Sequence, residues 1–195
     1  MSASALPREL ELADRITSWL QTPAAYSPAP DRVERIDTHI SRVFLAGSLV
    51  YKLKKSVKFD FLDFSTLAAR EHACREEVRL NRRLAADIYL GVVPITLEDD
   101  QQLRIDGRGR IVEWLLKMRR LPTEKTLPQL HHRGELKPYH IDRLADLLVR
   151  FYAAQQPVAI APATYRQDCL RHVQDNRREL LSVAHHLPRT VVLRS

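Results

Sequence analysis

The sequence has little cysteine and no long apolar run. Its two cysteines, Cys74 and Cys169, lie far apart in a chain of 195 residues and show no metal-ligand spacing. Nowhere do about 18 apolar residues follow one another, which predicts that no helix spans a membrane. The N-terminal stretch MSASALPRELELADR is charged and lacks the apolar centre of a secretory signal. We therefore expect a cytoplasmic protein in a reducing compartment, without a membrane partner.

Several functional motifs are also missing. No Walker A sequence occurs, which argues against a P-loop nucleotide site in this chain. The paired histidines His131-His132 and His185-His186 have no third ligand at a useful spacing, so we expect no metal site there. No internal repeat or low-complexity tract appears.

Positive charge is what the sequence has in excess. Lysine and arginine number 31 against 24 acidic residues, a formal net charge of +7. This balance favours anionic partners such as nucleotides, nucleic acids or phosphorylated metabolites. Three basic clusters, at 52–58, 79–83 and 117–120, raise the possibility of a nucleic-acid-binding module. No nucleic-acid reader motif accompanies them, so solvated faces are the preferred interpretation.

The order of predicted elements indicates an α+β fold. We expect a helix over 9–20, strands at 33–38, 41–46 and 49–55 with a tight turn at Gly47, a helix over 66–86 capped by Ser65, strands at 92–97 and 110–118 joined by a polar tip at 106–109, and helices after Pro122. This pattern predicts a five-stranded antiparallel sheet with one inserted helix. The predicted parts are an N-terminal helix and Pro-rich loop (1–32), the sheet domain (33–121) and a helical region (122–195).

The third predicted strand alternates apolar and cationic side chains. Val50, Lys52 and Lys54 share one face, while Tyr51 and Leu53 share the other, which we expect to face the core. Two interpretations of the first face stay open. It is a solvated face, as is usual for lysines, or it places a lysine on a phosphate while Val50 contacts a flat ligand.

The helix predicted over 66–86 carries an acidic residue on its apolar face. Helical periodicity groups Glu77 with Cys74, Leu80 and Leu84, whereas Glu76 lies among basic residues. A carboxylate on a buried face is costly unless it meets a cation, and Lys52 can supply one. Alternatively, Glu77 reaches water at the helix boundary or pairs with an arginine.

This combination resembles the N-terminal part of the aminoglycoside phosphotransferase-like family, which has a protein-kinase-like fold. In particular, it is similar to the bacterial subfamily often fused to a P-loop ATPase domain. The resemblance covers about residues 10–185 and is densest over 36–94. The segments that carry it are Thr38-His-Ile-Ser41, Val43-Phe-Leu-Ala-Gly47, Val50-Tyr-Lys-Leu-Lys-Lys55, Phe61-Leu-Asp-Phe-Ser65, Glu76-Glu-Val-Arg-Leu-Asn-Arg-Arg-Leu-Ala85 and Tyr89-Leu-Gly-Val-Val-Pro94.

The resemblance implies a kinase-like small lobe that binds ATP, followed by helices of an incomplete large lobe. By this similarity Lys52 would bind the nucleotide phosphates, Glu77 would hold Lys52, and Val50 would lie against the base. Lys54 is the second choice for the phosphate-binding lysine, because it shares the face of Lys52. Otherwise, Lys54 and Lys55 are the solvated continuation of the strand.

Two further segments receive roles from the resemblance. The turn with Thr38 and Ser41 would cover the phosphates, using hydroxyls and backbone amides because it has no glycine. His39 in that turn is either a contact or an ordinary turn residue. The strand end from Met118 to Arg120 would form the hinge that meets the adenine edge, or is simply the basic end of a core strand.

Phosphoryl transfer also needs an aspartate and an asparagine in a catalytic loop and a second, metal-binding aspartate. The sequence His140-Ile-Asp142 is the nearest match to the loop, but Leu147 stands where asparagine is required, and the segment has helical periodicity. The aromatic stretch 59–64 lacks the glycine expected after a metal-binding aspartate. We therefore expect the chain to end before the catalytic loop and to lack the ligands of Mg²⁺, as a truncated reading frame or a natural fragment would.

Two functions follow as alternatives. The first is the nucleotide-binding portion of an ATP-dependent small-molecule phosphotransferase whose acceptor the sequence does not reveal. The second is a catalytically silent pseudo-kinase fragment that binds a partner or self-associates through helices of the incomplete lobe. Binding of nucleic acid is the least favoured hypothesis.

Overall fold

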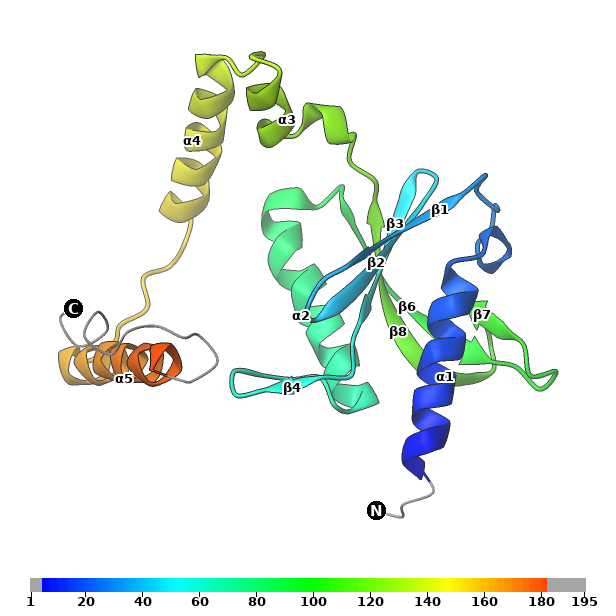
Figure 1. The fold of residues 1–195 in the computed structure, drawn as a ribbon. Coiled ribbons are helices and arrows are strands. Elements are labelled where there is room, and N and C mark those ends of the chain that lie inside the picture. Colours follow the sequence, from blue (N-terminus) through cyan, green and yellow to red (C-terminus); the bar gives the residue numbers. More distant parts are fainter. Residues whose placement is uncertain (1–4, 182–195) are drawn as a thin grey trace. The chain divides into compact units, whose positions relative to one another are not determined.

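The computed structural model describes residues 5–181 and confirms the α+β class. The chain divides into two compact units, residues 1–140 and 141–195, each of which is described by itself. The first unit contains a curled antiparallel sheet with helices (Figure 1). No helix among residues 5–181 is both long and apolar enough to cross a membrane.

The main sheet has six strands, not the five predicted. The strands are β1 (Val33–Asp37), β2 (Ser41–Ala46), β3 (Leu49–Lys54), β6 (Tyr89–Leu97), β7 (Leu103–Ile105) and β8 (Arg110–Arg119), in the spatial order β1-β2-β3-β8-β6-β7. The additional strand is β7, which pairs with the end of β6. Its three residues are too few to show an alternating pattern, which is why the sequence prediction placed only a polar connection there.

The turn between β2 and β3 confirms the predicted role of Gly47. This glycine has φ +60°, a left-handed conformation that residues with a Cβ rarely adopt. The tight turn sets the register in which Val43 lies opposite Lys52 and Leu45 lies opposite Val50. Because opposite residues of an antiparallel pair point to the same side, these four side chains share one face.

The other face of the sheet packs against α1 (Ala5–Leu20). Ile16 and Leu20 of this helix join the core formed by Phe44, Tyr51 and Leu53. Tyr51 and Leu53 are each 4% exposed, which confirms the predicted inward face of β3. A short 3-10 turn, η1 (Pro23–Ala25), follows the helix, and Tyr26 closes the core with its ring 5.1 Å from that of Tyr51.

The inserted helix α2 (Leu67–Ala85) follows a small hairpin of β4 (Lys58–Phe59) and β5 (Leu62–Asp63). Its N-cap is Thr66, whose hydroxyl accepts from the Ala69 amide, rather than the predicted Ser65. The hydroxyl of Ser65 instead donates to Asp63 at 2.5 Å, within the turn that leaves the hairpin.

An ion pair connects α2 to β8. The Arg70 Nε atom lies 3.0 and 2.9 Å from the two carboxylate oxygens of Glu113, and Arg70 Nη1 donates to the Phe64 carbonyl at 2.9 Å. Their side chains are only 10% and 12% exposed. Burial raises the pKa of Glu113, while Arg70 opposes this shift. This contact therefore joins α2 to the sheet through a largely buried ion pair.

The remaining helices are η2 (Thr123–Lys125), α3 (Leu127–His132), α4 (Pro138–Ala153) and α5 (Pro162–Leu180). The segment His140-Ile-Asp142 lies in α4, as its periodicity predicted, and not in a loop. Neither α4 nor α5 contains a buried residue; Ile141, Leu147 and Val173 are among their exposed apolar side chains.

Candidate functional site

Two lysines of β3 and one glutamate of α2 form a three-residue ion cluster, which we call the Lys-Glu-Lys cluster. Lys52 Nζ lies 2.8 Å from Glu77 Oε1, and Lys54 Nζ lies 2.8 Å from Glu77 Oε2. The side chains of Lys52, Lys54 and Glu77 are 25%, 5% and 18% exposed. Lys52 is therefore the more accessible of the two cations.

The local structure explains why these groups meet. Alternation along β3 places Lys52 and Lys54 on the face opposite the α1 core, where α2 crosses β8 and β6. On α2, Glu77 lies one turn after Cys74, which is 0% exposed. The neighbouring Glu76 pairs with Arg79 at the surface. The predicted inward orientation of Glu77 is confirmed.

Two details of the sequence prediction were wrong. Leu80 and Leu84, expected on the buried face of α2, are 47% and 44% exposed; the helix instead buries Arg70, Cys74 and Val78. Lys54 is not a solvated continuation of the strand. Its ammonium group is bound to Glu77 and lies 4.8 Å from the centre of the Phe64 ring, a cation–π arrangement that helps to hold it in place.

The electrostatics of Glu77 reflect its two partners. Burial alone would raise its pKa, but the hydrogen bonds and charges of Lys52 and Lys54 outweigh it and lower the pKa below the ordinary 4.5. The carboxylate is therefore ionised at neutral pH, and the cluster carries one net positive charge. A partly exposed cation with one surplus charge is suited to binding an anion.

The lowered pKa predicts a pH dependence of stability. A carboxyl group whose pKa is lower in the folded state stabilises the fold above its unfolded pKa, and this contribution is lost as the pH falls. The free-energy difference between the native protein and the Glu77→Gln variant should be largest above the ordinary value of 4.5 and shrink below it. Urea unfolding at a series of pH values measures it, and a difference that grows toward acid pH would contradict the assignment.

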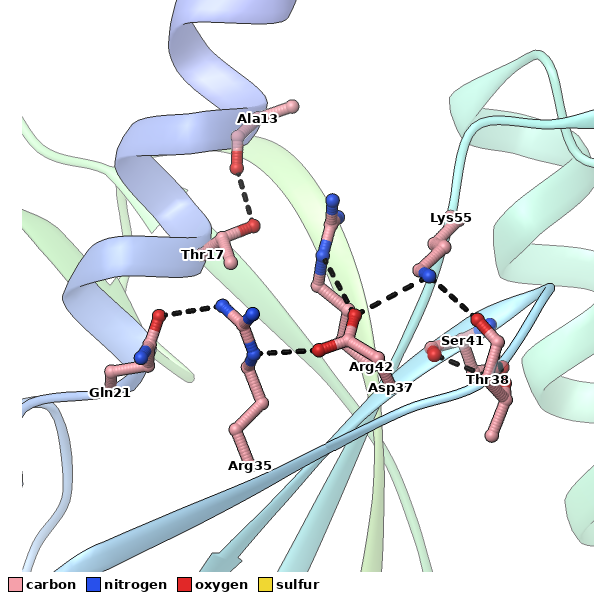
Figure 2. A network of polar contacts seen from close by, with 9 residues as sticks. All are labelled: Ala13, Thr17, Gln21, Arg35, Asp37, Thr38, Ser41, Arg42 and Lys55. Atoms are coloured by element: carbon pink, nitrogen blue, oxygen red, sulfur yellow. Dashed lines mark hydrogen bonds and ion pairs between the residues drawn. The ribbon is translucent and has the colours of Figure 1, made fainter.

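The turn between β1 and β2 is held by a network around Asp37 (Figure 2). Its carboxylate contacts three cations, with Arg35 Nε at 2.7 Å, Lys55 Nζ at 3.3 Å and Arg42 Nε at 3.6 Å. Lys55 Nζ also donates to the Thr38 carbonyl at 2.6 Å. Desolvation raises the pKa of Asp37, but the bond from Lys55 and the neighbouring charges lower it overall. Lys55, expected to be solvated, therefore ties the turn to the end of β3.

The hydroxyls of Thr38 and Ser41, which the resemblance assigned to the phosphates, are engaged by the protein or buried in it. The Thr38 hydroxyl accepts from the Ser41 amide at 2.9 Å. Ser41 is 0% exposed, and its hydroxyl has no hydrogen-bond partner within the described residues. The amides of His39 and Ile40, between them, donate no hydrogen bond to the described backbone. Among the described residues, the amides of His39 and Ile40 are thus donors without a backbone acceptor, whereas the Thr38 hydroxyl is hydrogen-bonded and the unpaired Ser41 hydroxyl is buried.

The C-terminal end of β8 leads to the predicted hinge. Met118 lies opposite Val50 of β3 and opposite Tyr89 of β6. The Arg119 amide donates to the Ile88 carbonyl and the Arg120 amide donates to the Ser48 carbonyl, both at 2.8 Å.

Past these residues one backbone donor is unused within the described residues. The Leu121 amide makes no backbone hydrogen bond in the described part of the chain. The Arg120 guanidinium pairs with Glu34 at 3.2 Å, so it contacts the sheet rather than a site of its own.

The basic clusters are largely satisfied by the protein itself. Lys58 pairs with Asp63, Arg79 with Glu76, and Arg82 donates to the carbonyls of Tyr89 and Leu90. A groove of about 610 Å³ between α2 and β6 is lined by arginines of this region but includes neither lysine of the Lys-Glu-Lys cluster. No group of three His, Cys, Asp or Glu residues suited to a metal ion occurs in residues 5–181.

The fold and site define an α+β protein in which a helix inserted between strands supplies a carboxylate to two strand lysines. Three uncharacterized mycobacterial proteins, one from Mycobacterium bovis and two from strains of Mycobacterium tuberculosis, are each 36% identical to this chain over 120 residues. The match covers 62% of this chain but 22% of each relative, so the chain spans a small part of their length. No family model matches the chain, and no solved structure matches it.

Proposed function

We propose that this chain is the nucleotide-binding part of an ATP-dependent small-molecule phosphotransferase, with a small lobe of the kinase-like kind found in aminoglycoside phosphotransferase-like proteins. The observation that supports it best is the ion pair between Lys52 of the central strand β3 and Glu77 of the inserted helix, at 2.8 Å. In kinases, such a pair holds the lysine on the inner phosphates of the nucleotide. The partly exposed ammonium of Lys52 fits this role.

The surroundings of Lys52 fit a flat ligand with a charged tail. Val43, Leu45 and Met118 lie partly exposed on the lysine face of the sheet and offer apolar contacts to a base, whereas Val50 on the same face is 8% exposed and so offers little surface. The amides of His39 and Ile40, which make no backbone hydrogen bond among the described residues, are donors for phosphate oxygens. With the amides of Arg119 and Arg120 already bonded, the Leu121 amide is the first donor past β8 that can meet the edge of a base.

A titration with ATP and Mg²⁺ tests the proposal, because ATP binds to such lobes as its magnesium complex. We assign no Mg²⁺ ligand in this chain. Saturable binding to the native protein is expected, and Lys52→Ala should weaken it by about 10- to 100-fold through loss of a charge-assisted hydrogen bond. Lys58→Ala is the matched control, since Lys58 is an exposed lysine paired with Asp63.

Two outcomes would overturn the nucleotide proposal. If Lys52→Ala binds ATP as well as the native protein does, Lys52 does not hold the phosphates. If neither protein binds ATP, the chain is better explained as a partner-binding module, for which the exposed apolar residues of α4 and α5 provide a surface. Binding of an oligonucleotide that falls steeply with added salt would instead indicate a nucleic-acid-binding module.

A further inference from the structure

The Lys-Glu-Lys cluster contains one more cation than a lysine-glutamate pair needs. Both oxygens of the Glu77 carboxylate are occupied, one by each lysine, at the same distance of 2.8 Å. The two lysines differ in their surroundings. The Lys54 side chain is 5% exposed and lies against the Phe64 ring, whereas Lys52 is 25% exposed.

This difference separates what the two ammonium groups can do. The Lys54 ammonium is buried, so it cannot leave Glu77 without remaining inside the protein as an unpaired charge. Lys52 can turn toward an anion at the surface. When it does so, Glu77 would be left unpaired inside the protein if Lys54 were absent.

We propose that Lys54 is a positioning residue, the permanent counter-ion of Glu77, which keeps α2 on the sheet while Lys52 is released to the phosphate of a bound nucleotide. The release of Lys52 to a nucleotide rests on the proposed function. The role of Lys54 in holding α2 on the sheet does not require a nucleotide. In the free protein, Lys54 neutralises Glu77. In the bound state, the Glu77–Lys54 pair stays intact and the charge of Lys52 is balanced by the ligand.

Cys74 provides a readout of the position of α2. It is buried, lies one helical turn before Glu77 and is one of only two cysteines in the chain. Burial raises the pKa of its thiol to about 11, so its reaction with a thiol reagent requires the helix to open. The other cysteine, Cys169, is exposed and can be replaced by serine to leave a single thiol.

The experiment compares Cys74 labelling by 4,4′-dithiodipyridine in the Cys169→Ser protein with and without further substitutions. Without nucleotide, Lys54→Met should speed labelling by about 10-fold or more. Glu77 then keeps only Lys52, whose ammonium group also turns to solvent, so Glu77 is left unpaired part of the time. Lys52→Met should speed it much less, since Lys54 still neutralises Glu77. Equal labelling rates in the two variants would overturn the proposal.

A second comparison separates charge compensation from a merely structural role of Lys54. In a Glu77→Gln background there is no carboxylate to neutralise and Lys54 is itself a buried cation without an anion. Adding Lys54→Met there should slow labelling rather than speed it, and should not weaken ATP binding further. If Lys54→Met is as damaging there as in the native background, its role is contact with Phe64 and the proposal fails. Should Lys54→Met alone not fold, recovery of the fold in the Glu77→Gln background supports the proposal, and failure in both backgrounds overturns it.

The ATP titration keeps this inference distinct from the proposed function. With Glu77 present, Lys54→Met should weaken ATP binding by about 10-fold, since Lys52 must stay with Glu77. If the native protein binds no ATP, the proposed function fails and the release of Lys52 fails with it. The labelling experiment still decides whether Lys54 holds α2.

Discussion

Replacing Arg70 by methionine is expected to lower the free energy of unfolding by about 3–5 kcal/mol, the usual cost of breaking a buried ion pair from one side. The substitution keeps the length of the side chain but leaves the Glu113 carboxylate 12% exposed and without its cation. It also removes the donor to the Phe64 carbonyl. Urea unfolding followed by tryptophan fluorescence measures the loss, because Trp114 lies next to Glu113.

Two controls define the effect of Arg70. Arg79→Met removes an arginine from the same helix whose pair with Glu76 lies at the surface, and should change stability far less. The double variant Arg70→Met with Glu113→Leu should regain most of the loss, because no buried charge remains.

The Arg70→Met penalty should also be smaller at acid pH than at neutral pH. Burial already raises the pKa of Glu113, and without Arg70 this carboxyl would take up a proton more readily as the pH falls. A loss in Arg70→Met no greater than that in Arg79→Met would show that the pair is not a significant link between α2 and β8.

Replacing Glu77 by alanine is expected to have the second largest effect. It leaves the buried ammonium of Lys54 without an anion and should lower the free energy of unfolding by about 3 kcal/mol, the lower end of the range, since Lys52 can turn to solvent. The same change should weaken ATP binding, because the ion cluster that holds α2 beside Lys52 is lost. Both quantities are measured on one preparation, by urea unfolding and by ATP titration.

Glu76→Ala is the matched control for Glu77→Ala. Glu76 precedes Glu77 on the same helix, but its carboxylate pairs with Arg79 at the surface. Helix propensity changes in the same way in both variants, so the difference between them reports the Lys-Glu-Lys cluster alone. Equal stability of the two variants would mean that the cluster does not hold α2 on the sheet.

The predicted elements that the structure confirms depend on local patterns. Alternation along β3 predicts that Tyr51 and Leu53 face the core and that Lys52 faces away, because successive side chains of a strand point to opposite sides. The period of α2 predicts that Glu77 points inward and Glu76 outward. Gly47 marks its turn because few other residues adopt its positive φ. Such signals lie within a few residues of one another.

The missed features depend on pairs that are distant in the sequence. Glu113 stands in an apolar strand and is 43 positions from Arg70, so nothing near either residue indicates that they pair. Lys54 is 23 positions from Glu77, and a pattern of exposed lysines was the better expectation until Phe64 and α2 are seen to cover it.

The sequence by itself therefore determined the α+β class, the faces of β3, the inward orientation of Glu77, and the candidate pair of Lys52 and Glu77, because period and turn chemistry act over short distances. Only the tertiary structure decided that β7 is the sixth strand, that Lys54 shares Glu77 with Lys52, and that three cations surround Asp37. These depend on which surfaces cover each side chain. Burial sets the cost of an unpaired charge, and burial is a property of the folded chain.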